Sequence, residues 1–217
     1  MEDLKQIKFT DIIIGIIVSI LLISFSVIII VNFRPLYYFD INHLDIVKHS
    51  GYNREDIIAN YDALIDYNSP FYKGELSFPT LPSSPEGLQH FKEVKDIFIL
   101  FYILALVSLV LTILIVIYKK RIKDYTYLLV SSLTAIILPT LVGLFVAIDF
   151  ERAFIIFHKI FFNNDYWIFD PSKDPVILIL PDTFFLHAAL LIIFIVLCGC
   201  LGLFIAYRKL IKKNKYI

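Results

Sequence analysis

Two histidines stand in the polar stretches between long apolar runs, and they are the residues best suited to chemistry. His90 lies seven residues before an apolar run that begins at Ile97, and His158 interrupts an aromatic segment from Ala153 to Pro171. Imidazole titrates near neutral pH, so it can take a proton from an amine or hydroxyl and return it to a leaving group. The two histidines are therefore candidates for acid/base catalysis of the kind that acyl transfer requires.

Charged residues near these histidines are candidates for supporting roles. The carboxylates of Asp149, Asp165, Asp170 and Glu93 could orient an imidazole ring and fix its tautomer. The guanidinium of Arg152 could polarise a developing oxyanion or hold a phosphate. The spacing along the chain selects none of these pairings, so they stay open.

The aromatic segment around His158 is typical of the interface between lipid tails and water, where such rings accumulate. It is expected to begin as a helix with one aromatic face and to lie in the headgroup layer. His90, on a helical extension of the next crossing, would lie about 10 Å beyond the hydrocarbon edge, at a similar depth. The rings of interest in the segment are Phe154, Phe157, Phe161 and Trp167.

Other chemistry finds weaker support in the sequence. There is no HExxH motif and no Cys/His cluster, so we expect no metal site. There is also no GxSxG nucleophile motif. The C-G-C of Cys198 and Cys200 lies inside an apolar run and favours small residues packing between helices over a redox pair. His43, His49 and His187 receive no assigned role, although His187 could cap a helix or bond to a neighbouring one.

Composition shows where these residues must be positioned. Hydrophobic residues make up 59% of the 217 residues, charged residues 18%, and the mean hydropathy is +0.77. These values exceed those of ordinary soluble domains and indicate an integral membrane protein. The formal net charge is zero, which gives no basic surplus for nucleic acid.

Four apolar runs are long enough to cross a bilayer once each as a helix. We therefore predict an all-α membrane protein of one domain with four transmembrane helices. The first run is longer than the apolar region of a signal peptide and has no A-x-A site after it, so it is expected to be an uncleaved anchor. The runs are 12–33, 97–118, 125–148 and 184–207.

Basic residues set the expected orientation. Eleven of the 20 Lys and Arg residues fall in three short segments, 1–11, 119–124 and 208–217, which the positive-inside rule places in the cytoplasm. Both termini would then be inside. The longer segments 34–96 and 149–183 would be extracytoplasmic, in the plasma membrane of a cell.

The first outer segment should contain an amphipathic helix and then an extended strap. Asn53 is a plausible N-cap for the helix, and a proline-rich stretch follows it. Ser84 and Pro85 read as the cap and first position of a helix that carries His90 into the second crossing. The apolar face of the amphipathic helix consists of Ile57, Ile58, Tyr61, Leu64 and Ile65.

A channel or transporter is the main non-enzymatic alternative. Charged residues inside crossings would mark an ion pathway, but the four runs carry none between their ends, and no internal repeat is visible. A non-enzymatic membrane assembly or transport partner and a phospholipid hydrolase nevertheless remain as alternatives to an acyltransferase.

Two sequence motifs resemble one known family. HFKEVKD precedes the second crossing, and FERAFIIFHKIFFNNDYWIFDPSKDPVILILPDTFF precedes the fourth. Both resemble the lipoprotein intramolecular transacylases of Gram-positive bacteria, which are small membrane proteins with four helices. The strap before His90 matches the family only loosely.

The resemblance implies a specific reaction without a cofactor. The partners would be bacterial lipoproteins with a diacylglyceryl-modified N-terminal cysteine, in contact with membrane lipids. The sn-2 acyl chain would move to the α-amino group, giving the N-acyl, S-monoacylglyceryl lyso-form. The family's essential histidines would fall on His90 and His158. His158 would be the base, His90 or a nearby donor would stabilise the oxyanion or protonate the glycerol oxygen, and a transient acyl-histidine is an alternative route. The rings of Phe154, Phe157, Phe161 and Trp167 would support the acyl chains.

Overall fold

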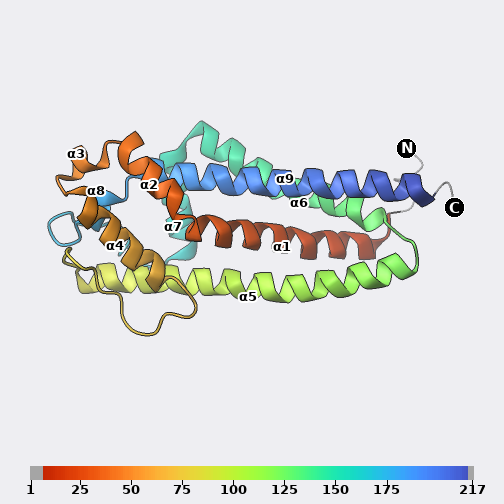
Figure 1. Ribbon diagram of the computed structural model, residues 1–217, viewed down its shortest axis with the longest axis horizontal. Coiled ribbons are helices and arrows are strands. Elements are labelled where there is room, and N and C mark those ends of the chain that lie inside the picture. Colours follow the sequence, from red (N-terminus) through yellow and green to blue (C-terminus); the bar gives the residue numbers. More distant parts are fainter. Residues whose placement is uncertain (1–6, 215–217) are drawn as a thin grey trace. The chain divides into compact units, whose positions relative to one another are not determined.

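The computed structural model describes residues 7–214, and every regular element in that part of the chain is a helix (Figure 1). This confirms the predicted all-α fold class. The helices are α1 (Phe9–Asn32), α2 (Arg34–His43), α3 (Ile46–Ser50), α4 (Arg54–Tyr67), α5 (Pro85–Arg121), α6 (Thr126–Ile148), α7 (Phe150–Phe161), α8 (Val176–Ile179) and α9 (Asp182–Asn214).

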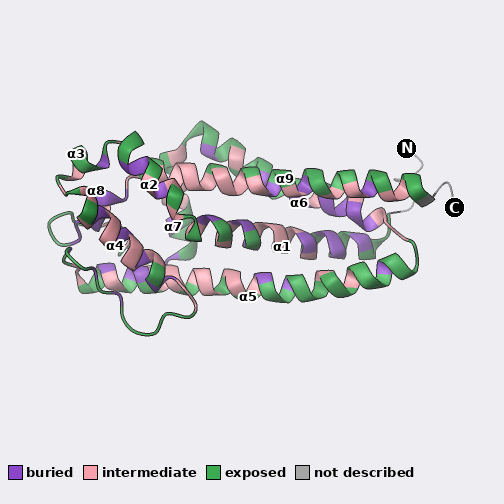
Figure 2. Ribbon diagram, in the orientation of Figure 1, coloured by how far each residue is buried: buried purple, intermediate pink, exposed green. Residues whose placement is uncertain are grey.

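Four of these helices, α1, α5, α6 and α9, are long and apolar enough to cross a membrane. Each predicted apolar run falls on one of them. Most side chains of α5 between residues 101 and 121 are exposed although they are apolar, which Figure 2 shows in green. Apolar side chains exposed along a whole helix are expected where lipid is the solvent.

The chain divides into two compact units, and all four long helices, α1, α5, α6 and α9, contribute residues to both. Unit 1 consists of the described residues of 1–27, 101–144 and 190–217, and unit 2 of residues 28–100 and 145–189. Both histidines of interest belong to unit 2.

Unit 1 packs through small residues. A Cβ added to Gly199 would lie 2.8 Å from a methyl group of Leu22, so glycine lets α9 lie against α1 without displacing that side chain. Cys200 is buried against Ala135 and Val196, while Cys198 is exposed and both thiols are free. Cys200 therefore has the packing role that the sequence predicted, and Cys198 does not.

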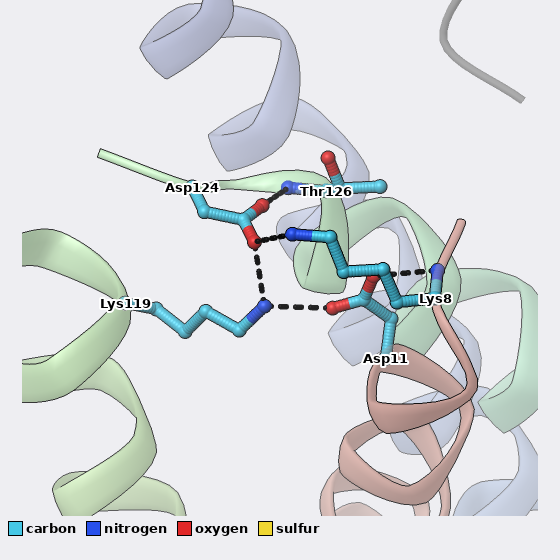
Figure 3. Close-up of polar contacts among 5 residues, drawn as sticks. All are labelled: Lys8, Asp11, Lys119, Asp124 and Thr126. Carbon is cyan, nitrogen blue, oxygen red and sulfur yellow. Dashed lines mark hydrogen bonds and ion pairs between the residues drawn. The ribbon is translucent and has the colours of Figure 1, made fainter. Parts of the chain in front are cut away.

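An ion-pair cluster ties the ends of three segments in unit 1 (Figure 3). The ammonium of Lys119 lies 2.8 Å from a carboxylate oxygen of Asp11 and 2.7 Å from one of Asp124. Asp11 is fully buried and Lys119 is 4% exposed, so this basic residue near the end of α5 forms a buried ion pair inside unit 1. Lys5 and Lys215, two of the residues used for the predicted orientation, lie outside the described part of the chain.

The core of unit 2 forms around the predicted amphipathic helix. The side chain of Asn53 caps α4 by accepting a hydrogen bond from the backbone of Asp56, as the sequence predicted. The ring of Tyr61 in α4 stacks on Tyr37 of α2 at 3.7 Å, and the Tyr37 hydroxyl donates to the carbonyl of Ile179 at 2.6 Å. The apolar face of α4 thus lies in a protein core.

The strap between α4 and α5 is irregular, as expected. Asn60 of α4 holds it by donating to the hydroxyl of Thr80 and accepting from the backbone of Thr80. The Ser84 hydroxyl then caps α5 by accepting a hydrogen bond from Gly87 N–H at 2.9 Å. This cap starts the helix that carries His90.

Candidate functional site

Unit 2 brings His90 and His158 together although 67 residues separate them in the sequence. Their ring centroids lie 5.9 Å apart with an interplanar angle of 32°. His90 is in the second turn of α5 and His158 in the last turn of α7. Both side chains are buried, with only 5% and 8% of the residue surface exposed, respectively.

A backbone carbonyl fixes the tautomer of His158. The ring nitrogen Nδ1 lies 2.7 Å from the carbonyl oxygen of Phe154, one helical turn earlier. A carbonyl can only accept, so Nδ1 must carry the hydrogen. In the neutral ring, Nε2 therefore keeps its lone pair and can accept a proton.

Burial keeps both imidazoles neutral at physiological pH. Burial, and next the neighbouring His158, lower the pKa of His90 to about 4, and the charge of Glu93 opposes this shift. Burial also lowers the pKa of His158, against smaller opposite effects of the Phe154 carbonyl and the Asp182 charge. Each group loses hydration energy when it becomes charged, so the neutral form is favoured.

Aromatic rings surround His158, and three of the four predicted ones contact it. Phe154 lies at 4.2 Å between centroids, Trp167 stacks at 4.7 Å and 29°, and Phe157 meets the ring edge-on at 5.4 Å. Phe161 instead contacts Phe157 at 4.7 Å. Phe154 and Phe157 contact His158 from the predicted aromatic face of α7, whereas Trp167 reaches it from the loop that follows the helix.

Two further rings, which the sequence analysis did not single out, cover His90. Phe162 lies 4.7 Å from His90 and 5.5 Å from His158, so it touches both imidazoles. Phe169 lies 5.5 Å from His90 and stacks on Phe91. Phe162 is adjacent to the predicted aromatic face, but only the folded loop shows that its ring turns toward His90.

The three predicted supporting residues lie elsewhere on the segment. Asp149 is the N-cap of α7, and its side chain accepts a hydrogen bond from the backbone of Arg152 at 2.9 Å. Arg152 and Asp165 are exposed. Within residues 7–214, no hydrogen bond or ion pair joins any of the three to His90 or His158. Asp149 thus positions the helix that carries His158 and does not orient the ring.

Glu93 is the carboxylate that the fold brings into the site. Its two oxygens each accept a hydrogen bond from the amide of Asn164 at 3.1 Å. Glu93 follows His90 by three residues on α5, while Asn164 lies in the loop after α7. This contact joins the two segments that carry the histidines.

The other three histidines lie outside the site formed by His90 and His158. Nδ1 of His187 lies 2.9 Å from both carboxylate oxygens of Asp40, which is fully buried, so His187 bonds to a neighbouring helix as one reading of the sequence allowed. His43 lies 5.9 Å from the His187 ring, and His49 is exposed. In the part of the chain that the structure describes, no group of three His, Cys, Asp or Glu side chains is arranged to hold a metal ion.

Comparison with known proteins gives one family and closely similar structures. The family model described as lipoprotein intramolecular transacylase Lit matches residues 12–185. The chain belongs to this family. A solved structure of the membrane-integral lipoprotein intramolecular transacylase Lit from Bacillus cereus is 38% identical, with a TM-score of 0.91 over 96% of this chain and 99% of that one.

Two variants of the same Bacillus cereus transacylase are also similar. The variant with a histidine-to-arginine mutation has a TM-score of 0.85 and covers 95% of this chain and 94% of its own. The variant with a histidine-to-alanine mutation has a TM-score of 0.86 and covers 96% of each chain. Both are 38% identical to this chain. No curated protein sequence matches.

Membership of the lipoprotein intramolecular transacylase family makes this chain an acyltransferase and a multi-pass membrane protein, with four helices that can span the bilayer. The family resemblance seen in the sequence is thereby confirmed.

Proposed function

We propose that this transacylase moves the sn-2 acyl chain of a diacylglyceryl-cysteine lipoprotein to the α-amino group of the same cysteine. His90 and His158 carry the protons. The observation that carries this proposal is the 5.9 Å pair of buried imidazoles, one of them with a fixed tautomer. Family membership supplies the substrate class.

The reaction forms an amide bond and breaks an ester bond. The α-ammonium first loses a proton, and the free amine attacks the carbonyl carbon of the sn-2 ester. Nε2 of His158 accepts the second amine proton, because its lone pair is unprotonated. The bond from the carbonyl carbon to the glycerol oxygen then breaks, and that oxygen receives a proton from the histidine pair. One proton is released overall.

Low dielectric surroundings limit the pair to one positive charge at a time. Protonation of one ring opposes protonation of the other, since the two imidazoles lie close together away from water. A proton taken from the amine is thus held briefly and available for the leaving oxygen. Such acid/base transfer typically accelerates a reaction by about 10²–10⁴-fold.

Positioning of the lipid supplies a second contribution. Amine and ester belong to one molecule, and a site that bends the lipid until they meet can provide up to about 7–11 kcal/mol through effective concentration. Phe154, Phe157, Phe161 and Trp167 support the acyl chains. Phe157 is 45% exposed and meets the His158 ring edge-on, so it both contacts the proposed base and is accessible to an acyl chain.

The site faces the extracytoplasmic side, where lipoproteins are anchored in the outer leaflet. Segments 34–96 and 149–183 are outside, and 1–11, 119–124 and 208–217 are inside, according to the positive-inside rule. The crossings are 12–33, 97–118, 125–148 and 184–207. Labelling of single introduced cysteines in each segment with a membrane-impermeant reagent tests this topology.

Mass spectrometry of lipoprotein N-terminal peptides tests the reaction in cells that lack other N-acylation enzymes. We expect the acyl chain on the α-amino nitrogen and a monoacylglyceryl thioether when the protein is present. His90→Ala and His158→Ala should each abolish conversion without loss of protein, because each removes one of the two histidines that carry protons. His49→Ala is the matched control, since His49 is exposed.

Three outcomes would contradict the proposal. If the acyl chain stays on glycerol in cells that contain the protein, the transacylation is wrong. Release of free fatty acid would identify a hydrolase. Normal conversion by either histidine variant would remove that residue from the mechanism.

A further inference from the structure

Trp167 places a hydrogen-bond donor in the site that no protein group uses. Its ring stacks on His158 with 4.7 Å between centroids. The indole nitrogen Nε1 is buried, and no acceptor for its hydrogen exists among residues 7–214. Indole N–H can only donate, so this group is unsatisfied in the absence of substrate.

A second unsatisfied atom belongs to the other histidine of the site. Nδ1 of His90 is also buried without a partner, in a residue that is 5% exposed. Five buried side-chain atoms in the described residues lack a partner, and two of them belong to rings that contact His158. Buried polar groups without partners are rare in folded proteins, and they call for an explanation such as catalysis.

Stacking does not explain why this ring carries an N–H. A phenyl ring could also stack on His158 and would leave no buried donor unpaired. The unpaired donor carries a desolvation penalty. A substrate oxygen that accepts this hydrogen would remove the penalty when the substrate binds. The bond would be strongest in the transition state, when that oxygen carries negative charge.

We propose that the indole N–H of Trp167 donates a hydrogen bond to the carbonyl oxygen of the sn-2 ester and stabilises the oxyanion formed on attack. This rests on the proposed transacylation. As the amine adds, the π electrons of the carbonyl move onto its oxygen, and the indole hydrogen stays on nitrogen throughout. Trp167 is thus the donor for the oxyanion, which leaves His90 free to protonate the glycerol oxygen.

Trp167→Phe tests the donor, because it keeps an aromatic ring beside His158 and removes the N–H together with the five-membered part of the indole. With purified protein in detergent and a synthetic diacylglyceryl-cysteine peptide, we expect kcat to fall by about 10²–10³-fold, as is typical when one oxyanion donor is lost. KM should change little, since the donor acts mainly in the transition state. The Tm of this variant reports two opposing effects, removal of an unpaired donor and loss of packing by the smaller ring, so an isosteric variant is needed beside it.

Two matched variants isolate the effect. Tyr166→Phe, in the adjacent and exposed residue, should keep the activity of the unmodified protein. Replacement of Trp167 by 3-benzothienylalanine, which has a sulfur atom in place of the N–H and nearly the same shape, should reproduce the loss of kcat even if phenylalanine packs poorly. Loss of kcat with an unchanged Tm in the benzothienyl variant supports the proposal.

Normal kcat in the benzothienyl variant would overturn the role of Trp167 and leave the transacylation intact. No N-acylation by the unmodified protein would overturn the proposed function itself. The two failures are therefore distinguishable in one experiment.

Discussion

Gly87→Ala should destabilise unit 2 because the cap of α5 leaves no room for a side chain. A Cβ on Gly87 would lie 2.3 Å from Oδ1 of Asp174, 2.9 Å from its Cγ and 3.2 Å from a ring carbon of Phe169. The carboxylate is 4% exposed and accepts hydrogen bonds from the backbone N–H and the hydroxyl of Ser84, at 2.7 Å and 2.6 Å. Alanine can fit only if Asp174 moves away.

The magnitude follows from the bonds that this movement breaks. Hydrogen bonds to a charged group contribute about 1.5–3 kcal/mol each, so loss of both costs about 3–6 kcal/mol. The better helix propensity of alanine returns up to about 1 kcal/mol. We expect a net loss of about 2–5 kcal/mol in the free energy of unfolding. For a protein of this size that corresponds to a fall in Tm of roughly 4–20 °C.

Thermal unfolding in detergent and the initial N-acylation rate are the measurements. Phe169 packs on His90, so a displaced Asp174 should also lower the rate. Gly202→Ala is the control, because no atom lies within 4 Å of a Cβ added there, and its Tm should stay unchanged or rise. In an Asp174→Ala background, Gly87→Ala should cost little more, since the clashing group is already gone.

An equal Tm for Gly87→Ala and Gly202→Ala would refute the reasoning. Full additivity of Gly87→Ala and Asp174→Ala would refute it as well, because the two residues would then not be coupled.

Acidification and a change in the loop after α7 give two more tests. The pKa of His90 is lowered to about 4 from 6.5, so the unfolded chain binds more protons between these values and the free energy of unfolding falls as the pH drops through that window. The fall attributable to His90 is up to about 3 kcal/mol. His90→Phe should remove this part of the pH dependence in thermal scans from pH 7.5 to 4.5. Equal pH dependence in the unmodified protein and the variant would contradict the assigned burial effect. Asn164→Ala breaks the contact with Glu93 that joins the two histidine-bearing segments and should lower kcat by about 10- to 100-fold, whereas Asn163→Ala, in an exposed neighbour, should not. Similar kcat values for the two asparagine variants would show that this contact does not position the histidines.

The sequence could predict the long helices because lipid leaves few options for the backbone. An uninterrupted apolar run must satisfy its own hydrogen bonds, so α1, α5, α6 and α9 follow from composition alone. The periodic apolar residues behind Asn53 likewise predict α4. Local rules suffice to predict both kinds of helix, since their hydrogen bonds and caps join residues only a few positions apart in the sequence.

Helix α2 could not be predicted in this way. Its sequence is too polar for a crossing and too short to be stable alone. Tyr37 shows what stabilises it, because the ring stacks on Tyr61 and the hydroxyl bonds to Ile179, which lies 142 residues away. Such contacts depend on the completed fold.

In the candidate site, too, some features could be predicted from the sequence and others depend on the completed fold. His90 and His158 could be paired because both segments were expected at headgroup depth and because the motifs resembled one family. The contact of Glu93 with Asn164 has no local signal. Asp149 did have one, because an aspartate directly before a helical face is a common N-cap, and its bond to the backbone three residues later is the usual one.

His187 and His158 have different hydrogen-bond partners in unit 2, a carboxylate and a backbone carbonyl. His187 faces the buried carboxylate of Asp40, whose two oxygens both lie 2.9 Å from its Nδ1, so this contact ties α9 to α2. The His158 ring instead makes its hydrogen bond with the carbonyl of Phe154, which fixes the tautomer without adding a full charge, and the Asp182 charge has a smaller effect than burial. A proton acceptor must be unprotonated before it works, so a carboxylate in place of that carbonyl would oppose the proposed chemistry. Aromatic burial and a carbonyl partner together give a neutral, oriented base, which suits the imidazole proposed to accept the proton.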